Sequence, residues 1–81
     1  MRVQVRFYSY FKDLAGCSGA TEHLAPGSSI QALLERIHER FPKLGPLAKS
    51  TLVAVGVEYQ PRSYILREDD EVSLFPPVQG G

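Results

Sequence analysis

Apolar and polar residues alternate in two stretches near the ends of the chain, residues 2–8 and residues 71–75. A period of two predicts strands that bury one face. A continuous apolar run at residues 52–57 predicts a further strand, covered on both faces and central in its sheet. The inward positions of the alternating strands are Val3, Val5, Phe7, Val72 and Leu74, and shorter strands, turns or edge segments are expected at residues 21–24, 58–63 and 64–66.

One long helix is the clearest local prediction, because apolar residues recur at spacings of three and four. Ser28 is the expected N-cap, and Gln31 three residues later completes a capping box. Pro42 ends the helix near Phe41. A shorter helix or turn is expected over residues 9–16. The apolar stripe of the long helix consists of Ile30, Leu33, Leu34, Ile37 and Phe41.

The elements follow the order strand, strand, helix, strand, short segment and strand. This order predicts an α+β fold, a mixed sheet of four to five strands packed on one main helix, with the first and last strands as parallel neighbours at its centre. The arrangement matches the β-grasp, or ubiquitin-like, roll. Residues 1–75 are expected to form this domain, and residues 76–81 to form an extended, flexible C-terminal tail.

Composition narrows the classes of function. The 81 residues suffice for one domain, and nine basic side chains balance nine acidic ones. The charge balance therefore gives no reason to expect binding to nucleic acid or to an acidic membrane. No apolar run is long enough to span a bilayer, and residues 1–6 lack the apolar block of a signal peptide. The single cysteine, Cys17, fits a reduced, cytoplasmic setting.

The body of the chain shows no catalytic pattern. Cys17 is either a nucleophile or sulfur donor or, as we prefer, an inert loop residue. His23 and His38 are lone histidines, expected at the surface or at its border. The acidic stretch at residues 68–71 fits a solvated turn better than a cation site. We therefore expect no metal site.

Three aromatic residues form the first candidate site. Tyr8 and Phe75 fall on the outward side of neighbouring predicted strands, and Tyr59 lies just past the central one. Outward aromatics on one sheet face make an apolar patch, and such patches often bind partners. The alternative interpretation is that they are isolated surface residues, or core residues whose register is misassigned.

The C-terminal stretch from Pro76 to Gly81 is the second candidate. Pro76 and Pro77 have fixed φ and no N–H, so they end the last strand and favour an extended backbone. Gly80 and Gly81 have no side chains and fit a slot too narrow for other residues. The reactive group is the α-carboxylate of Gly81, which an enzyme can activate by joining it to the α-phosphate of ATP. The alternative is a frayed terminus.

Several motifs stand together in this chain: Phe7-Tyr8, the run from Lys12 to Gly16, Val53-Ala54-Val55, Asp70-Glu71-Val72, and Phe75-Pro76-Pro77-Val78 with Gly80-Gly81. With them the chain resembles the small-subunit family of molybdopterin synthase (MoaD), which are ubiquitin-like sulfur carriers. The resemblance covers nearly the whole length. Its most specific part is the whole final motif, from Phe75 to Gly81. The Gly-Gly pair by itself is less specific, because thiamine-pathway carriers and ubiquitin relatives share it.

The resemblance implies a carrier rather than an enzyme. An E1-like, MoeB-like adenylating enzyme would use ATP to activate Gly81, and sulfur from a persulfide would then leave a thiocarboxylate there. The tail would enter a MoaE-like large subunit, in a heterotetramer, and give sulfur to cyclic pyranopterin monophosphate to form the molybdopterin dithiolene. Tyr8, Tyr59 and Phe75 would dock both partners. No cofactor would be bound permanently.

Two positions depart from the family pattern. Gly56 stands where an Asn is common, and Asp69 stands where the acidic turn usually has Gly. If that turn requires a positive φ, Asp tolerates it at some cost.

Two other functions stay open. The same chemistry could serve thiamine synthesis, tRNA thiolation or protein conjugation. Alternatively, the chain is an interaction module with an inert tail, which would still work after deletion of Gly80 and Gly81.

Overall fold

The computed structural model describes residues 1–77. No helix within that range is both long enough and apolar enough to cross a membrane. In chain order the elements are β1 (Arg2–Phe7), α1 (Phe11–Ala15), β2 (Gly19–His23), α2 (Ile30–Arg40), the 3-10 helix η1 (Pro42–Ser50), β3 (Leu52–Val55), β4 (Glu58–Tyr59) and β5 (Glu71–Phe75).

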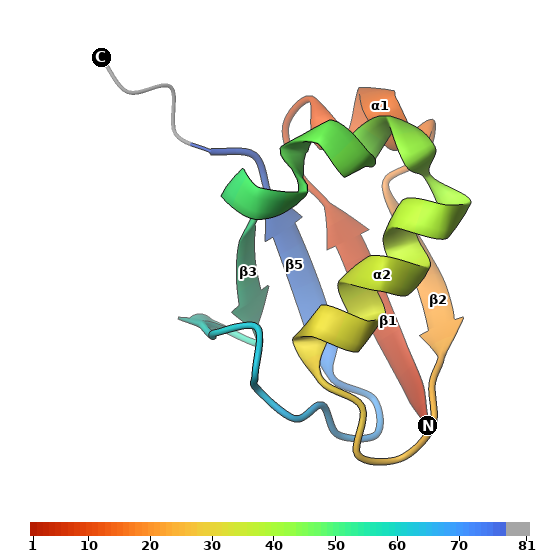
Figure 1. Ribbon diagram of the computed structural model, residues 1–81, viewed down its shortest axis with the longest axis vertical. Coiled ribbons are helices and arrows are strands. Elements are labelled where there is room, and N and C mark those ends of the chain that lie inside the picture. Colours follow the sequence, from red (N-terminus) through yellow and green to blue (C-terminus); the bar gives the residue numbers. More distant parts are fainter. Residues whose placement is uncertain (78–81) are drawn as a thin grey trace.

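The strands form one mixed sheet of five, in the order β2-β1-β5-β3-β4 (Figure 1). β1 and β5 pair in parallel, as predicted, and the other neighbours are antiparallel. The apolar run at residues 52–57 supplies β3, which lies inside the sheet between β5 and β4, as predicted. β3 ends at Val55, where Gly56 turns the chain with a φ of 61° into the two-residue edge strand β4.

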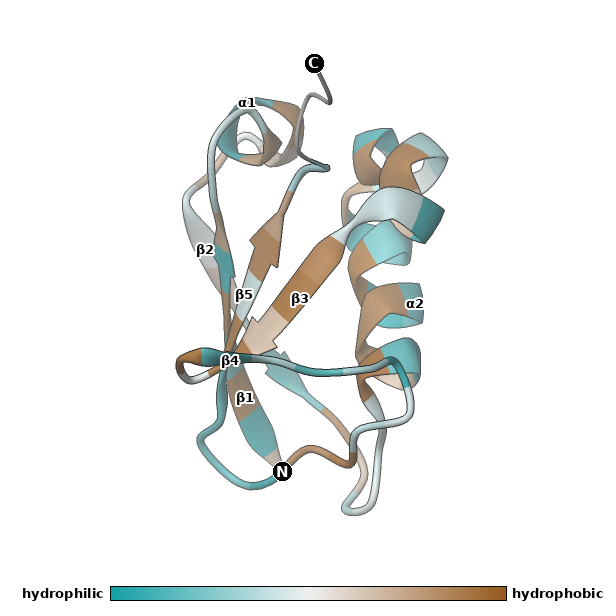
Figure 2. Cartoon of the chain, turned by 90° about the vertical axis from the view of Figure 1, so that its left-hand side faces the viewer, coloured by the Kyte–Doolittle hydropathy of each residue, from teal (hydrophilic) through white to brown (hydrophobic). Residues whose placement is uncertain are grey.

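The helix α2 lies across one face of the sheet, and Figure 2 shows its brown, apolar side turned toward the strands. Phe41, just past its end, is half-buried and meets Phe7 edge to face, with ring centroids 5.1 Å apart. Burial of such side chains is the main term that stabilises the fold. The predicted stripe is confirmed, since Ile30, Leu33, Leu34 and Ile37 are all buried.

The N-cap of α2 is Ser29, so the prediction of Ser28 is wrong by one residue. The Oγ of Ser29 accepts a hydrogen bond from the N–H of Ala32 at 3.3 Å, whereas the hydroxyl of Ser28 donates to the carbonyl of Ala25. The long-range pairing of Ser29 with Ile65 holds its backbone extended, as an N-cap requires. This constraint comes from a segment far away in the sequence.

The connection from α1 to β2 depends on two glycines. Gly16 ends α1 with a φ of 78°, as predicted, and its N–H donates to the carbonyl of Lys12. Gly19 is the first residue of β2, which begins two residues before the segment expected at residues 21–24. A Cβ there would stand 2.6 Å from the carbonyl oxygen of Val5, so the two strands approach closely because this residue is glycine.

The edge strand β2 is tied to α2 by an ion pair. Glu22 is only 3% exposed, and its carboxylate accepts a hydrogen bond from the guanidinium of Arg40, at the end of α2. Arg40 also donates to the carbonyl of Thr21. A buried carboxylate without a partner is costly, so this contact holds the helix end against the sheet.

Arg40→Ala is expected to lower the free energy of unfolding by about 1–3 kcal/mol, because it leaves the Glu22 carboxylate buried and unpaired. This expected loss is smaller than the loss for a fully buried ion pair, because the Arg40 side chain is 47% exposed. Urea unfolding followed by circular dichroism measures the change. Arg36→Ala, at an exposed position of the same helix, is the control, and equal losses in both variants would contradict the role of the pair.

His38 predicts a pH dependence of stability. Partial burial, and then the charge of Arg62, lower the pKa of His38 from its ordinary value of 6.5. The unfolded chain then binds a proton more readily than the folded one, so stability is lost as pH falls through about 6.5. His38→Gln is expected to flatten this part of the stability curve, measured as urea midpoints at several pH values. An unchanged curve would show that His38 is not responsible.

Candidate functional site

Tyr8, Tyr59 and Phe75 come together on the sheet face opposite α2, as predicted. The rings of Tyr8 and Phe75 are stacked, with centroids 4.7 Å apart and 16° between their planes. Tyr59 meets Phe75 at 6.2 Å and 69°. Stacked and edge-to-face contacts of this kind favour a fixed arrangement of the rings. We call these three residues the aromatic surface.

The register of the sheet explains this placement. Phe7 pairs with Leu74 and both are buried under the helix, so the next residue of each strand points to the other face. Tyr8 and Phe75 are those residues. Tyr59 reaches the same face because β4 pairs it with Ala54, two residues from the partner of Phe75 in β3.

Two further apolar residues extend the aromatic surface, and the sequence pattern did not identify them. Leu52, opposite Phe75, is 38% exposed, and Val57, at the turn into β4, is 99% exposed. The continuous apolar run suggested burial on both sides, and only the pairing partners show that one side is open. Contiguous exposed apolar side chains are typical of a surface that binds another molecule.

The last strand is held on both edges to within one residue of its end. Leu52 pairs with Phe75 on one side, and on the other the N–H of Tyr8 donates to the carbonyl of Leu74 at 3.2 Å. Pro76 and Pro77 follow directly and lack the N–H that would continue the ladder. The strand therefore ends at a firmly held point beside the aromatic surface. The predicted tail residues Val78, Gly80 and Gly81 lie outside the described residues.

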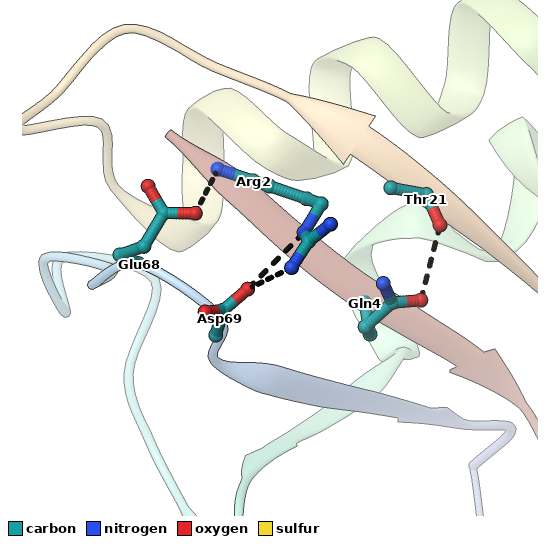
Figure 3. Close-up of polar contacts among 5 residues, drawn as sticks. All are labelled: Arg2, Gln4, Thr21, Glu68 and Asp69. Atoms are coloured by element: carbon teal, nitrogen blue, oxygen red, sulfur yellow. Dashed lines mark hydrogen bonds and ion pairs between the residues drawn. The ribbon is translucent and has the colours of Figure 1, made fainter.

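The turn that leads into β5 is locked against the start of β1 (Figure 3). Asp69 has a φ of 64°, so this turn does require the left-handed conformation. Its carboxylate accepts hydrogen bonds from Nε and Nη2 of Arg2 at 3.1 and 2.8 Å, and its N–H donates to the Arg2 carbonyl. Glu68 accepts a hydrogen bond from the backbone N–H of Arg2. Asp69 thus offsets its backbone cost with contacts that glycine cannot make.

The other candidate side chains stand apart from the aromatic surface. Cys17 is exposed between α1 and β2, and His23 is exposed in β2. His38 is half-buried on α2, on the helix layer. Within residues 1–77, no three His, Cys, Asp or Glu side chains are grouped so that they could hold a metal ion.

Comparison with known proteins identifies the family. Residues 5–81 match the ThiS family. The chain belongs to the ThiS family. A relative in Chlamydomonas reinhardtii, named molybdopterin synthase sulfur carrier subunit, is 30% identical and is aligned over 100% of both chains.

Solved structures show the same fold as this ThiS-family chain. SAMP1 from Haloferax volcanii has a TM-score of 0.89 at 18% identity over 100% of both chains. A putative molybdopterin converting factor, subunit 1, from Pyrococcus furiosus has a TM-score of 0.88 at 27% identity, over 96% of this chain and 99% of that one. A complex of subunits 1 and 2 of molybdopterin-converting factor from Helicobacter pylori contains a chain with a TM-score of 0.70 at 22% identity, over 100% of both chains. The ubiquitin-like β-grasp fold is therefore confirmed.

The left-handed turn before β5 gives a prediction that separates backbone strain from the loss of side-chain contacts. Asp69→Ala and Asp69→Gly both remove the carboxylate, but Ala at a positive φ is strained by about 1 kcal/mol and Gly is not. Asp69→Ala is therefore expected to be the less stable variant, measured by thermal unfolding. If it were as stable as Asp69→Gly, the turn would not require the left-handed conformation.

Proposed function

We propose that this chain is the sulfur carrier of a molybdopterin synthase. The observation that carries the proposal is the full-length match to a relative of that name, together with a family match that extends to residue 81. The names of the curated relatives favour this pathway over thiamine synthesis, tRNA thiolation or an inert interaction module. A cytoplasmic location is part of the proposal and rests on the single cysteine.

The proposed chemistry takes place at the carboxylate of Gly81. A carboxylate is a poor electrophile, so an adenylating enzyme first attaches it to the α-phosphate of ATP and releases pyrophosphate. A persulfide sulfur then attacks the acyl carbon, and AMP leaves with one of the original carboxylate oxygens. Reductive cleavage of the S–S bond by a thiol leaves a thiocarboxylate on Gly81. Two such transfers to cyclic pyranopterin monophosphate, each of one sulfur, would build the dithiolene.

The residues of this chain support the proposal through position and shape. β5 is paired with β1 up to Leu74 and with β3 up to Phe75. Pro76 and Pro77 then limit the backbone directions in which the chain can leave the sheet. Gly80 and Gly81 would present no side chain to the walls of a narrow active site. ATP would be used in the adenylating enzyme, so this chain needs no bound cofactor of its own.

The proposed partners are a MoaE-like large subunit, which would supply the active site within a heterotetramer, and a MoeB-like adenylating enzyme. The Helicobacter pylori fold neighbour was solved together with its second subunit, which supports a partner of the first kind. The aromatic surface is the docking face that we propose for both. It lies where β5 ends, so a protein bound there is within reach of the tail.

The proposal predicts a change in the intact mass of the protein. Incubation with the adenylating enzyme, ATP and a persulfide donor is expected to add about 16 Da, the difference between sulfur and oxygen at one site. Mass spectrometry of the intact chain and of its C-terminal peptide measures the gain and its position.

Two variants serve as controls for this mass gain. Deletion of Gly80 and Gly81 is expected to abolish it, and Cys17→Ser is expected to leave it unchanged. A gain that maps to Cys17, or no gain at all in the full chain, would rule out the proposed function.

A further inference from the structure

The face that carries the aromatic surface has a hollow at its middle. Ser73 of β5 and Ala54 of β3 are paired and point to this face. On the same face, the next pair toward the end of β5 is Phe75 and Leu52. Tyr59 lies beside Ala54 on the side of the outer edge. Small residues are therefore surrounded by large ones on one sheet face. The hollow has a volume of about 280 Å³. We call it the socket.

The burial of its floor shows that the socket has walls. Ser73 is 5% exposed and Ala54 is 7% exposed, although α2 lies on the opposite face. Large neighbouring side chains must therefore shield them from solvent. The stacked rings of Tyr8 and Phe75 form one wall, and Tyr59 with Val57 forms another.

The charge of the socket favours an apolar occupant. Its one carboxylate, that of Glu71, lies at the end away from Phe75 and is paired with Nε of Arg6 at 3.2 Å. Both groups are about half exposed, so their charges are also well solvated. A cation would have to compete with Arg6 for the Glu71 carboxylate, and an anion would be repelled by that carboxylate. An uncharged, apolar side chain meets neither cost and gains contact with aromatic walls.

The location of the socket indicates which protein supplies that side chain. Phe75 is both part of the wall and the last residue before Pro76. Residues 76–81 reach at most about 20 Å when extended. A protein that receives Gly81 in its active site must therefore come close to the socket. The active site and the socket contact are then parts of one interface.

We propose that the socket receives one large apolar side chain, of the size of Leu, Met or Phe, that projects from the large subunit of the synthase. This inference rests on the proposed function and adds a specific contact to it. The inserted side chain would anchor the large subunit at a fixed distance from the tail. Such pockets in otherwise flat interfaces are where a few residues supply most of the binding energy.

Ala54→Leu tests the proposal, because it fills the socket from its floor without touching the tail. Calorimetric titration with the large subunit is expected to show affinity weakened at least about tenfold relative to the unaltered chain. Thr21→Leu adds bulk to the same sheet face outside the socket and is expected to bind normally. Urea unfolding of both variants shows that they are folded.

A second variant keeps the test decisive if Ala54→Leu does not fold. Val57 is 99% exposed, so Val57→Ser alters a wall with no loss of core packing, and is expected to weaken binding about threefold. Equal affinity of the socket variants and the unaltered chain would overturn the proposal, as would an equal loss in Thr21→Leu.

Other occupants give distinct results, each of which would overturn the socket proposal. Tighter binding of Ala54→Leu would indicate that the chain's own tail competes for the socket. A dimer of the unaltered chain that Ala54→Leu converts to monomer, in sedimentation, would indicate a second copy. If the unaltered chain neither binds the large subunit nor gains mass at Gly81, the proposed function itself fails, which is separate from failure of the socket.

Discussion

The pairing of β5 with both β1 and β3 is the constraint on which the rest of the molecule depends. Hydrogen bonds on its two edges fix which face each residue of the strand presents. Val72 and Leu74 are thereby committed to the core, and Ser73 and Phe75 to the opposite face. A shift of register by one residue would exchange these two sets. The same pairing that builds the core therefore also builds the aromatic surface and fixes the point where the chain leaves the sheet.

The two ends of β5 are secured by different means. Before its start, the left-handed backbone of Asp69 is held by Arg2. The turn and the first strand are joined by an ion pair, by the N–H of Asp69 donating to the Arg2 carbonyl, and by the N–H of Arg2 donating to the Glu68 carboxylate. At its end, Pro76 and Pro77 have no backbone N–H, so the hydrogen-bond ladder cannot continue through them. The strand is thus fixed in register at one end and terminated at the other. A carrier needs both, because its tail must begin from a defined place but must remain available to a partner.

Local sequence pattern sufficed to predict β1, β5, α2 and their order, since burial on one face leaves a period of two or a helical stripe. It failed wherever a distant segment decides the outcome. Ser29 rather than Ser28 caps α2 because Ile65 pairs with it, and Leu52 is exposed because β3 lies next to a two-residue edge strand. Tyr8 and Phe75 could be predicted from the alternation of inward and outward positions, and Tyr59 from its place just past the apolar run. The buried floor at Ala54 and Ser73 depends on strand order, which the pattern does not specify.

The division of labour between sheet and tail follows from these constraints. Recognition requires rigid side chains at fixed separations, and a sheet with stacked rings provides them at little entropic cost. The proposed reaction at Gly81 requires the opposite, a slender chain that enters an active site and is withdrawn again. If one chain must serve two partners in turn, its affinity for each has to be low enough to allow exchange. Most of the apolar contact area therefore cannot contribute strongly to the free energy of binding. The proposed socket would meet this requirement, because one inserted side chain would give selectivity without making the complex permanent.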